Sequence, residues 1–199
     1  MKIIITESQF KRLIENIISE SDSRRQEFID ILNKEKFPYE IKDSKQPSAG
    51  MGKIIIGGYI IDSDLITYIP DNVEFNNNSH VELYSVNKMG NNIEFNNDGD
   101  VGLYSLEKIG NNIEFNNDGT VWLDSLKKMG DNIKFNNNGN VNLESIIWFD
   151  TFSVNFTNNV DDVHFGQETF WMGLFPYELY NIKGDFYILN KEDKYEIIK

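Results

Sequence analysis

Hydrophobic and polar positions along this chain follow a pattern that repeats every 20 residues between about residue 70 and residue 146. Each unit opens with a phrase such as Asn91-Asn-Ile-Glu-Phe-Asn-Asn and continues with one such as Val101-Gly-Leu-Tyr-Ser-Leu. In the first phrase Ile93 and Phe95 alternate with Glu94, which is typical of a strand that buries one face. A fixed period of this length indicates a stack of structural repeats. The pattern therefore predicts a mainly β fold, a parallel β-solenoid of 20-residue coils.

The inward positions are regular enough to place the strands. Val101 and Leu103 are expected to point inward and residue 102 outward, while Gly and Asn in the turn at 97–99 tolerate positive φ. We expect a right-handed solenoid over residues 54–165 that rises by about 4.8 Å per coil. Its parallel strands should lie near 73–75, 93–95, 113–115 and 133–135, with one buried column formed by Phe75, Phe95, Phe115 and Phe135.

The chain divides into a helical segment at 1–37, a linker at 38–52, and a solenoid domain with its C-terminal cap at 53–190. The linker is small, polar and punctuated by Pro and Gly, as exposed loops are. The aromatic run at 170–176 is predicted to form the cap, because the open end of a stack needs a cover. A degenerate first coil is predicted from Ile54, Ile56, Ile60, Leu65 and Ile69.

The N-terminal segment predicts two short helices. The first, over residues 6–20, starts at a capping box formed by Thr6 and Gln9. The second follows Ser23 and stops at Phe37-Pro38, because the residue before Pro disfavours the helical conformation.

One face of the first helix is an apolar stripe. Helices of this length are marginal by themselves, so the stripe is expected to dock on the end of the solenoid or on another protein. The stripe consists of Phe10, Leu13, Ile14, Ile17 and Ile18.

Composition excludes several classes of function. The net charge is −13, so phosphate backbones are repelled and no nucleic-acid partner is expected. The absence of Cys removes disulfides and thiolate metal ligands. The apolar runs are too short to cross a bilayer and no signal peptide is visible, so no membrane partner is expected.

Three groups of polar residues carry candidate chemistry. Columns of Asn, such as those of Asn92 and Asn97, predict amide ladders along the stack, with a sugar- or ice-binding array as the alternative. The turn Asn96-Asn-Asp98-Gly-Asp100 is similar to calcium-binding loops, but the other turns lack its acidic residue, which favours simple turn chemistry. His80 and His164 are far apart and no nucleophile or nucleotide motif accompanies them. We therefore expect no enzyme activity, no cofactor and no bound metal.

The outward positions of the second strand differ from coil to coil, whereas the inward positions agree. Exposed Trp and Tyr are the residue types that dominate binding hot spots. Gly102, one coil away from Trp122, predicts a shallow notch that would accept a partner side chain. The alternative is that the helices, the linker or a neighbouring subunit covers this face. The predicted protein-binding residues are Trp122, Tyr104, Tyr84, Asp124 and Glu144.

Two stretches of the chain resemble known proteins. The N-terminus, Met1-Lys-Ile-Ile-Ile-Thr-Glu-Ser-Gln-Phe-Lys-Arg-Leu-Ile-Glu, resembles the start of uncharacterised proteins of tailed bacteriophages. The unit at Ile69-Pro70-Asp71-Asn72-Val73 resembles the short leucine-rich-like solenoid repeats of phage and bacterial proteins. The resemblance implies a non-enzymatic phage-encoded module that binds another protein, a virion component or a host factor, in the virion or the host cytoplasm. The alternative is a carbohydrate-binding or adhesion module that binds a glycan through the aromatic face.

Overall fold

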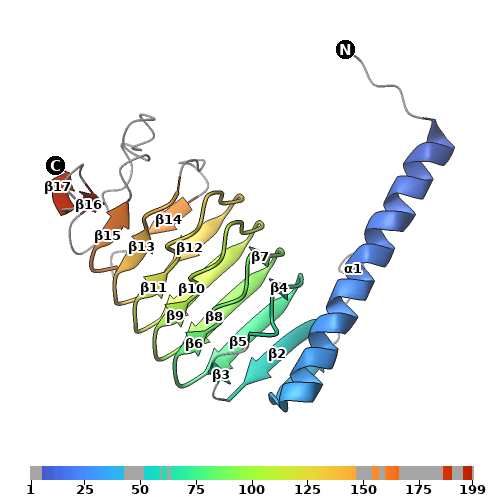
Figure 1. Cartoon of the computed structure of the whole chain (residues 1–199), viewed down its shortest axis with the longest axis horizontal. Coiled ribbons are helices and arrows are strands. Elements are labelled where there is room, and N and C mark those ends of the chain that lie inside the picture. Colours follow the sequence, from blue (N-terminus) through green and yellow to red (C-terminus); the bar gives the residue numbers. More distant parts are fainter. Residues whose placement is uncertain are drawn as a thin grey trace.

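A computed structural model of the chain describes residues 6–42, 52–58, 60–61, 64–146, 154–156, 160–165, 186–189 and 195–198. Figure 1 shows a stack of coils, with the long helix α1 (Glu7–Glu35) beside its first coil. Successive coils contribute strands to two sheets, and strands of neighbouring coils pair in parallel. The predicted mainly β fold, a parallel β-solenoid, is confirmed.

The described strands form two long sheets and one short one. The first is 7-stranded, in the order β1 (Tyr39–Lys42), β2 (Lys53–Gly57), β5 (Val73–Asn77), β8 (Ile93–Asn97), β10 (Ile113–Asn117), β12 (Ile133–Phe135) and β14 (Val154–Phe156). The second is 8-stranded, in the order β17 (Tyr195–Ile198), β16 (Phe186–Leu189), β15 (Val163–Phe165), β13 (Val141–Leu143), β11 (Val121–Trp122), β9 (Val101–Gly102), β6 (Val81–Glu82) and β3 (Ile60–Ile61). The third is 2-stranded, formed by β4 (Tyr68–Ile69) and β7 (Lys88–Met89).

The core consists of side-chain columns in which equivalent residues of successive coils lie on one another. Phe75 is paired in register with Phe95, and their ring centroids are 4.7 Å apart. The column continues through Phe115, Phe135 and Phe156 with centroid separations of 5.1, 5.0 and 5.0 Å. These values match the spacing of paired strands, about 4.8 Å. The predicted buried Phe column is therefore confirmed, and it extends one coil further than predicted.

Positive φ lies at a different corner of the coil from the one predicted. Within the described residues it occurs at Asn92, with φ 57°, and not in the turn at 97–99. Asn tolerates this left-handed conformation better than most residues do. The same conformation recurs one coil apart at Asn72, Asn112 and Asn132.

The first coil has one inward position different from the prediction. Leu65 is 40% exposed, whereas the next residue, Ile66, is buried at 1%. Ile66 stands 20 residues before Val86 and 40 before Leu106, both of which are buried. The period of the later coils therefore also governs the degenerate one.

α1 is one continuous helix where the sequence predicts two. It begins as predicted, because the Gln9 backbone N–H donates to Thr6 Oγ1 at 3.3 Å and the Thr6 N–H donates to Gln9 Oε1 at 2.8 Å. The expected break is absent because Ser21-Asp22-Ser23 lowers helix propensity without removing a backbone donor, as Pro would. The helix stops just before Phe37-Pro38, as predicted.

The C-terminal half of α1 covers the open end of the solenoid. Phe28 and Leu32 are 1% and 0% exposed and belong to the same apolar core as the coils. The buried Arg25 guanidinium donates to the backbone carbonyls of Gly52 and, at 3.2 Å, of Asp71. Burial lowers the pKa of Arg25, although the neighbouring carboxylates oppose this effect. An exposed stack end is a liability, and α1 removes it at the N-terminal side.

Several predicted features fall outside the described residues. The residues of the predicted docking stripe belong to α1, but their side chains are not among those described. These residues are Phe10, Leu13, Ile14, Ile17 and Ile18. The aromatic run at 170–176 is also outside them, although β16 extends the second sheet in parallel with β15. Within the segment 38–52, the residues of β1 pair antiparallel with β2.

Replacing Phe115 with Ala should lower the free energy of unfolding by about 3–5 kcal/mol, because it leaves a cavity in a close-packed column. Urea denaturation measures the change. The matched control is Asp98→Ala, at an exposed position of the preceding coil. A loss for Phe115→Ala no larger than that of the control would contradict the buried column.

Replacing Leu32 with Ala should cost about 2–5 kcal/mol, since this side chain joins α1 to the solenoid core. Lys34→Ala, on the exposed side of the same helix, should change stability little. Thermal unfolding followed by circular dichroism compares the two. Equal melting temperatures for Leu32→Ala and the wild type would show that α1 does not cap the stack.

Candidate binding face

The outward side of the second sheet presents two columns of side chains. One column is Glu82, Gly102, Trp122, Asn142 and His164, each paired in register with the next. The other column lies two residues further along each coil, at Tyr84, Tyr104, Asp124 and Glu144. Because the sheet is parallel and in register, residues 20 apart in the sequence are neighbours here.

Three aromatic residues of this face are in contact. The rings of Tyr84 and Tyr104 are stacked, with centroids 5.3 Å apart and an angle of 12° between their planes. Trp122 continues the row at 6.3 Å from Tyr104, tilted by 34°. Tyr84 is 37% exposed, and the other two are half-buried. The structure therefore brings the three predicted aromatic residues together as one surface feature, called here the aromatic strip (Tyr84, Tyr104 and Trp122).

The predicted notch at Gly102 is filled by the protein itself. A Cβ placed on Gly102 would lie 2.7 Å from Cε2 of Tyr104, and Gly102 is buried. The absence of a side chain at this position thus makes room for the Tyr104 ring, not for a partner residue. The prediction was wrong because a neighbouring side chain on the same strand face can turn over a glycine.

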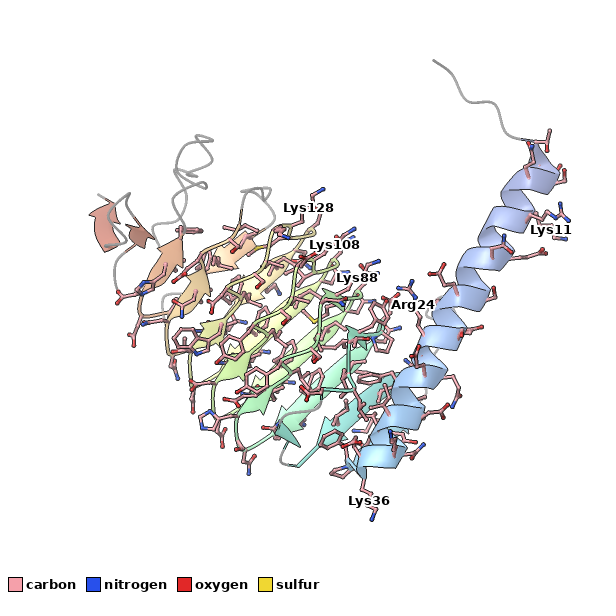
Figure 2. The ribbon with its side chains drawn as sticks, viewed as in Figure 1. Lys11, Arg24, Lys36, Lys88, Lys108 and Lys128 are labelled. Atoms are coloured by element: carbon pink, nitrogen blue, oxygen red, sulfur yellow. The ribbon has the colours of Figure 1, made fainter. Side chains whose placement is uncertain are left out.

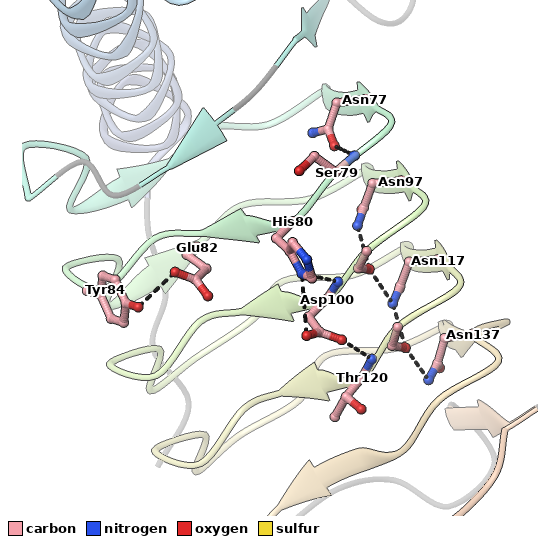
Figure 3. A network of polar contacts seen from close by, with 12 residues as sticks. Asn77, Ser79, His80, Glu82, Tyr84, Asn97, Asp100, Asn117, Thr120 and Asn137 are labelled. Carbon is pink, nitrogen blue, oxygen red and sulfur yellow. Dashed lines mark hydrogen bonds and ion pairs between the residues drawn. The ribbon is translucent and has the colours of Figure 1, made fainter.

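Carboxylates surround the aromatic strip. The Tyr84 hydroxyl donates to Glu82 Oε2 at 2.8 Å, as Figure 3 shows. Burial raises the pKa of Tyr104, and the negative charges of Glu82, Asp124 and Asp100 raise it further. The strip therefore lies in a region of negative potential.

Asp124, at the Trp122 end of the strip, is half-buried, as is Glu144 beside it. Burial raises the pKa of Asp124, and the charge of Glu144 adds to this shift. The Oδ1 atom of Asp124 is buried and has no hydrogen-bond partner within the described part of the chain. A buried carboxylate oxygen without a donor is unfavourable, which is why burial favours the protonated form of this carboxyl.

A polar column beside the N-terminal ends of the second-sheet strands was not predicted from the sequence. The Asp100 N–H donates to His80 Nδ1 at 3.0 Å, and the Thr120 N–H donates to Asp100 Oδ1 at 2.7 Å (Figure 3). The signal was the 20-residue spacing of these positions, each just before a strand of the second sheet. These bonds satisfy backbone donors between coils, which is a structural role.

Of the two Asn columns, the one that contains Asn92 forms the predicted amide ladder. Asn92, Asn112 and Asn132 each donate from Nδ2 to Oδ1 of the residue one coil earlier, at 3.0, 2.9 and 2.9 Å. Buried Asn97 and Asn117 instead donate to the carbonyls of Gly99 and Gly119, at 2.8 and 2.9 Å. Both sets of amides are therefore engaged in holding coils and turns together.

The described residues contain no group of three or more His, Cys, Asp or Glu side chains that could hold a metal ion. The acidic column of the first sheet is instead neutralised by lysine. Lys53 Nζ lies 2.7 Å from Glu74 and 2.9 Å from Glu94, and Lys134 lies 3.9 Å from Glu114.

The fold and this face define a β-solenoid with an exposed aromatic strip. No protein-family model, curated protein or solved structure matches the chain. Among the described residues, no helix is both long and apolar enough to cross a membrane.

The Asp124 pKa, raised above its ordinary value of 3.8, predicts a pH-dependent stability. A carboxyl with a raised folded-state pKa favours folding when it is protonated, and this contribution is lost as the pH rises through the folded-state pKa. Asp124→Asn should therefore melt at a higher temperature than the wild type at pH 7. The difference should shrink as the pH falls toward 3.8.

The control for this experiment is Asp98→Asn, at an exposed turn position. Thermal melts at several pH values compare the three proteins. A wild type that is more stable than Asp124→Asn at pH 7 would show that the ionised carboxylate stabilises the fold, contrary to this account.

Proposed function

We propose that this chain is a non-enzymatic, phage-encoded protein-binding or virion structural module that carries its binding face on a repeat solenoid. The observation that supports the proposal is the aromatic strip. Tyr84, Tyr104 and Trp122 lie in three successive coils, each in contact with the next and partly accessible to solvent. Contiguous exposed aromatic area is typical of interaction surfaces, because apolar area in contact with water is unfavourable unless a partner covers it.

The strip is also rigid, which favours tight binding. Trp122 lies on β11, Tyr84 and Tyr104 lie two residues after β6 and β9, and the rings already pack on one another. Side chains that are ordered before binding lose less conformational entropy on association. Trp and Tyr are, in addition, the residues most enriched in hot spots.

The phage origin rests on the resemblance of the N-terminus and of the repeat units to phage proteins. Under this proposal the partner is a virion component or a host factor, and the protein acts in the virion or the host cytoplasm. The helical stripe at residues 10–18 would be a second docking element, separate from the strip. Mass spectrometry of purified particles tests whether the chain is part of the virion.

A carbohydrate-binding or adhesion function is the second candidate. The observation that favours it is the hydrogen-bonded pair of the Tyr84 hydroxyl and Glu82 at 2.8 Å beside the rings. Such a pair offers donors and acceptors next to an apolar surface, as pockets that orient polar ligands do. Binding to a glycan array would favour this function over the first.

Trp122→Ala tests the proposed function. Stability should stay within about 1 kcal/mol of the wild type, because the indole is only half-buried. Affinity for a protein partner should fall by about 2 kcal/mol or more, the usual size of a hot-spot loss. A thermal melt and a binding titration on the same variant measure both quantities.

Asn76→Ala, at an exposed position of the first sheet, is the control and should change neither quantity. A large loss of stability in Trp122→Ala would show that the indole serves the fold. Unchanged affinity at unchanged stability would remove the aromatic strip from the binding surface.

A further inference from the structure

A row of three lysines runs along a different side of the same coils. Lys88, Lys108 and Lys128 are connected by parallel bridges from one coil to the next, and all three are exposed. Figure 2 shows them in line along one edge of the stack, with their ammonium groups pointing away from the coils. We call these three residues the lysine column.

The lysine column differs from the other charged columns of the solenoid because its charges are not paired within the described part of the chain. Elsewhere the solenoid pairs charges along its axis: Lys127 lies 2.7 Å from Glu107, and Lys53 bridges two glutamates. Among the described residues, none of the three column lysines makes an ion pair, although the chain carries 32 acidic residues against 19 basic ones. Three like charges about one strand spacing apart repel one another, and a partner with negative charge at the same spacing would relieve this.

The aromatic strip presents the opposite chemistry. Its rings are flanked by the half-buried carboxyl groups of Glu82 and Asp124, and Glu144 lies next to Asp124. An ammonium group placed there would meet an aromatic ring and a carboxylate together. Both interactions favour a cation, and the first is strongest with Trp.

The two surfaces also match in position along the stack. Lys88 belongs to the same coil as Tyr84, Lys108 to that of Tyr104, and Lys128 to that of Trp122. Within each coil, one lysine therefore stands at the same height as one part of the strip: Lys88 as Tyr84 and Glu82, Lys108 as Tyr104, and Lys128 as Trp122 and Asp124. Because both surfaces rise by one coil per residue, two copies with parallel axes and no axial shift would bring all three levels together.

We propose, resting on the protein-binding function above, that the partner of the aromatic strip is a second copy of this chain, which inserts its lysine column along the strip. The contact joins two different surfaces, so each copy can bind one neighbour through its strip and another through its lysines. Such heterologous contacts produce rings or filaments instead of closed dimers. With parallel axes and no axial shift, the rotation that relates neighbours generates a ring.

A charge exchange between the two surfaces tests this inference. The first variant carries Lys88→Glu, Lys108→Glu and Lys128→Glu, and the second carries Glu82→Lys and Asp124→Lys. Sedimentation velocity should show assemblies larger than dimers for the wild type as its concentration rises. Each variant alone should be monomeric, its association weakened by at least about 100-fold, because like charges then face each other. An equimolar mixture should assemble again, with the two variants in equal amounts.

The control variant carries Lys11→Glu, Lys34→Glu and Lys42→Glu, which change the net charge as much as the first variant does but lie on α1 and β1. It should assemble like the wild type. Circular dichroism confirms that each variant is folded, and if Asp124→Lys unfolds the chain, Glu82→Lys alone replaces it.

The inference is overturned if the wild type stays monomeric up to about millimolar concentration, the weak limit of specific association. It is also overturned if the lysine variant assembles like the wild type, if the control loses assembly equally, or if the mixture stays monomeric. A monomeric wild type that still binds another protein through Trp122 would leave the proposed function standing. A wild type that assembles as expected while Trp122→Ala binds every partner normally would overturn the role of the strip.

Discussion

The structure depends on one constraint: each coil lies directly on its own near copy, in register, at the spacing of paired strands. This distance leaves no freedom at the corners. A Cβ on Gly110 would lie only 2.3 Å from the Gly90 carbonyl oxygen of the preceding coil. Inside the stack, side chains that pack well against a neighbour of the same kind are therefore favoured. Phe does so by stacking, at centroid distances near 5 Å, and Asn by donating to the Asn before it.

Charged residues are the difficulty in such a stack, because in-register stacking places like charges side by side. Two arrangements in the structure reduce this repulsion. Lysines neutralise the glutamates of the first sheet, as at Lys53 with Glu74 and Glu94. In another column the uncharged residues Asn91 and Asn111 separate Asp71 from Asp131. The Oδ1 atom of each Asn accepts from the backbone N–H of the equivalent residue in the next coil, at 2.9 and 2.8 Å. Neither arrangement applies to the lysine column, which is why it is a candidate for contact with a partner.

Features that follow from the 20-residue period could be predicted from the sequence. The Phe column, the strand positions and the Asn ladders all repeat identical residues, so in-register stacking determines their neighbours. The grouping of Tyr84, Tyr104 and Trp122 followed from the same rule.

Features that depend on a side-chain rotamer, or on a small difference in local conformational free energy, could not be predicted. The Tyr104 ring covers Gly102 because of its rotamer, about which the repeat says nothing. The continuity of α1 through Ser21-Asp22-Ser23 reflects a propensity cost too small to break a helix whose C-terminal half is held by Phe28 and Leu32. The position of Ile66 was obscured because the first coil lacks the flanking pattern of the others.

In-register stacking is tested most directly by cross-linking, which the absence of Cys makes straightforward. Glu94 and Glu114 are paired in register on neighbouring strands, whereas Lys134 lies one coil further, opposite Glu114. Disulfides need Cα atoms roughly 4.4–6.8 Å apart, a condition met by neighbouring coils at about 4.8 Å and not by coils two levels apart. The variant Glu94→Cys with Glu114→Cys should therefore form an intramolecular disulfide under mild oxidation, and Glu94→Cys with Lys134→Cys should not. Equal cross-linking of both variants, or cross-linking of the second alone, would contradict the stack.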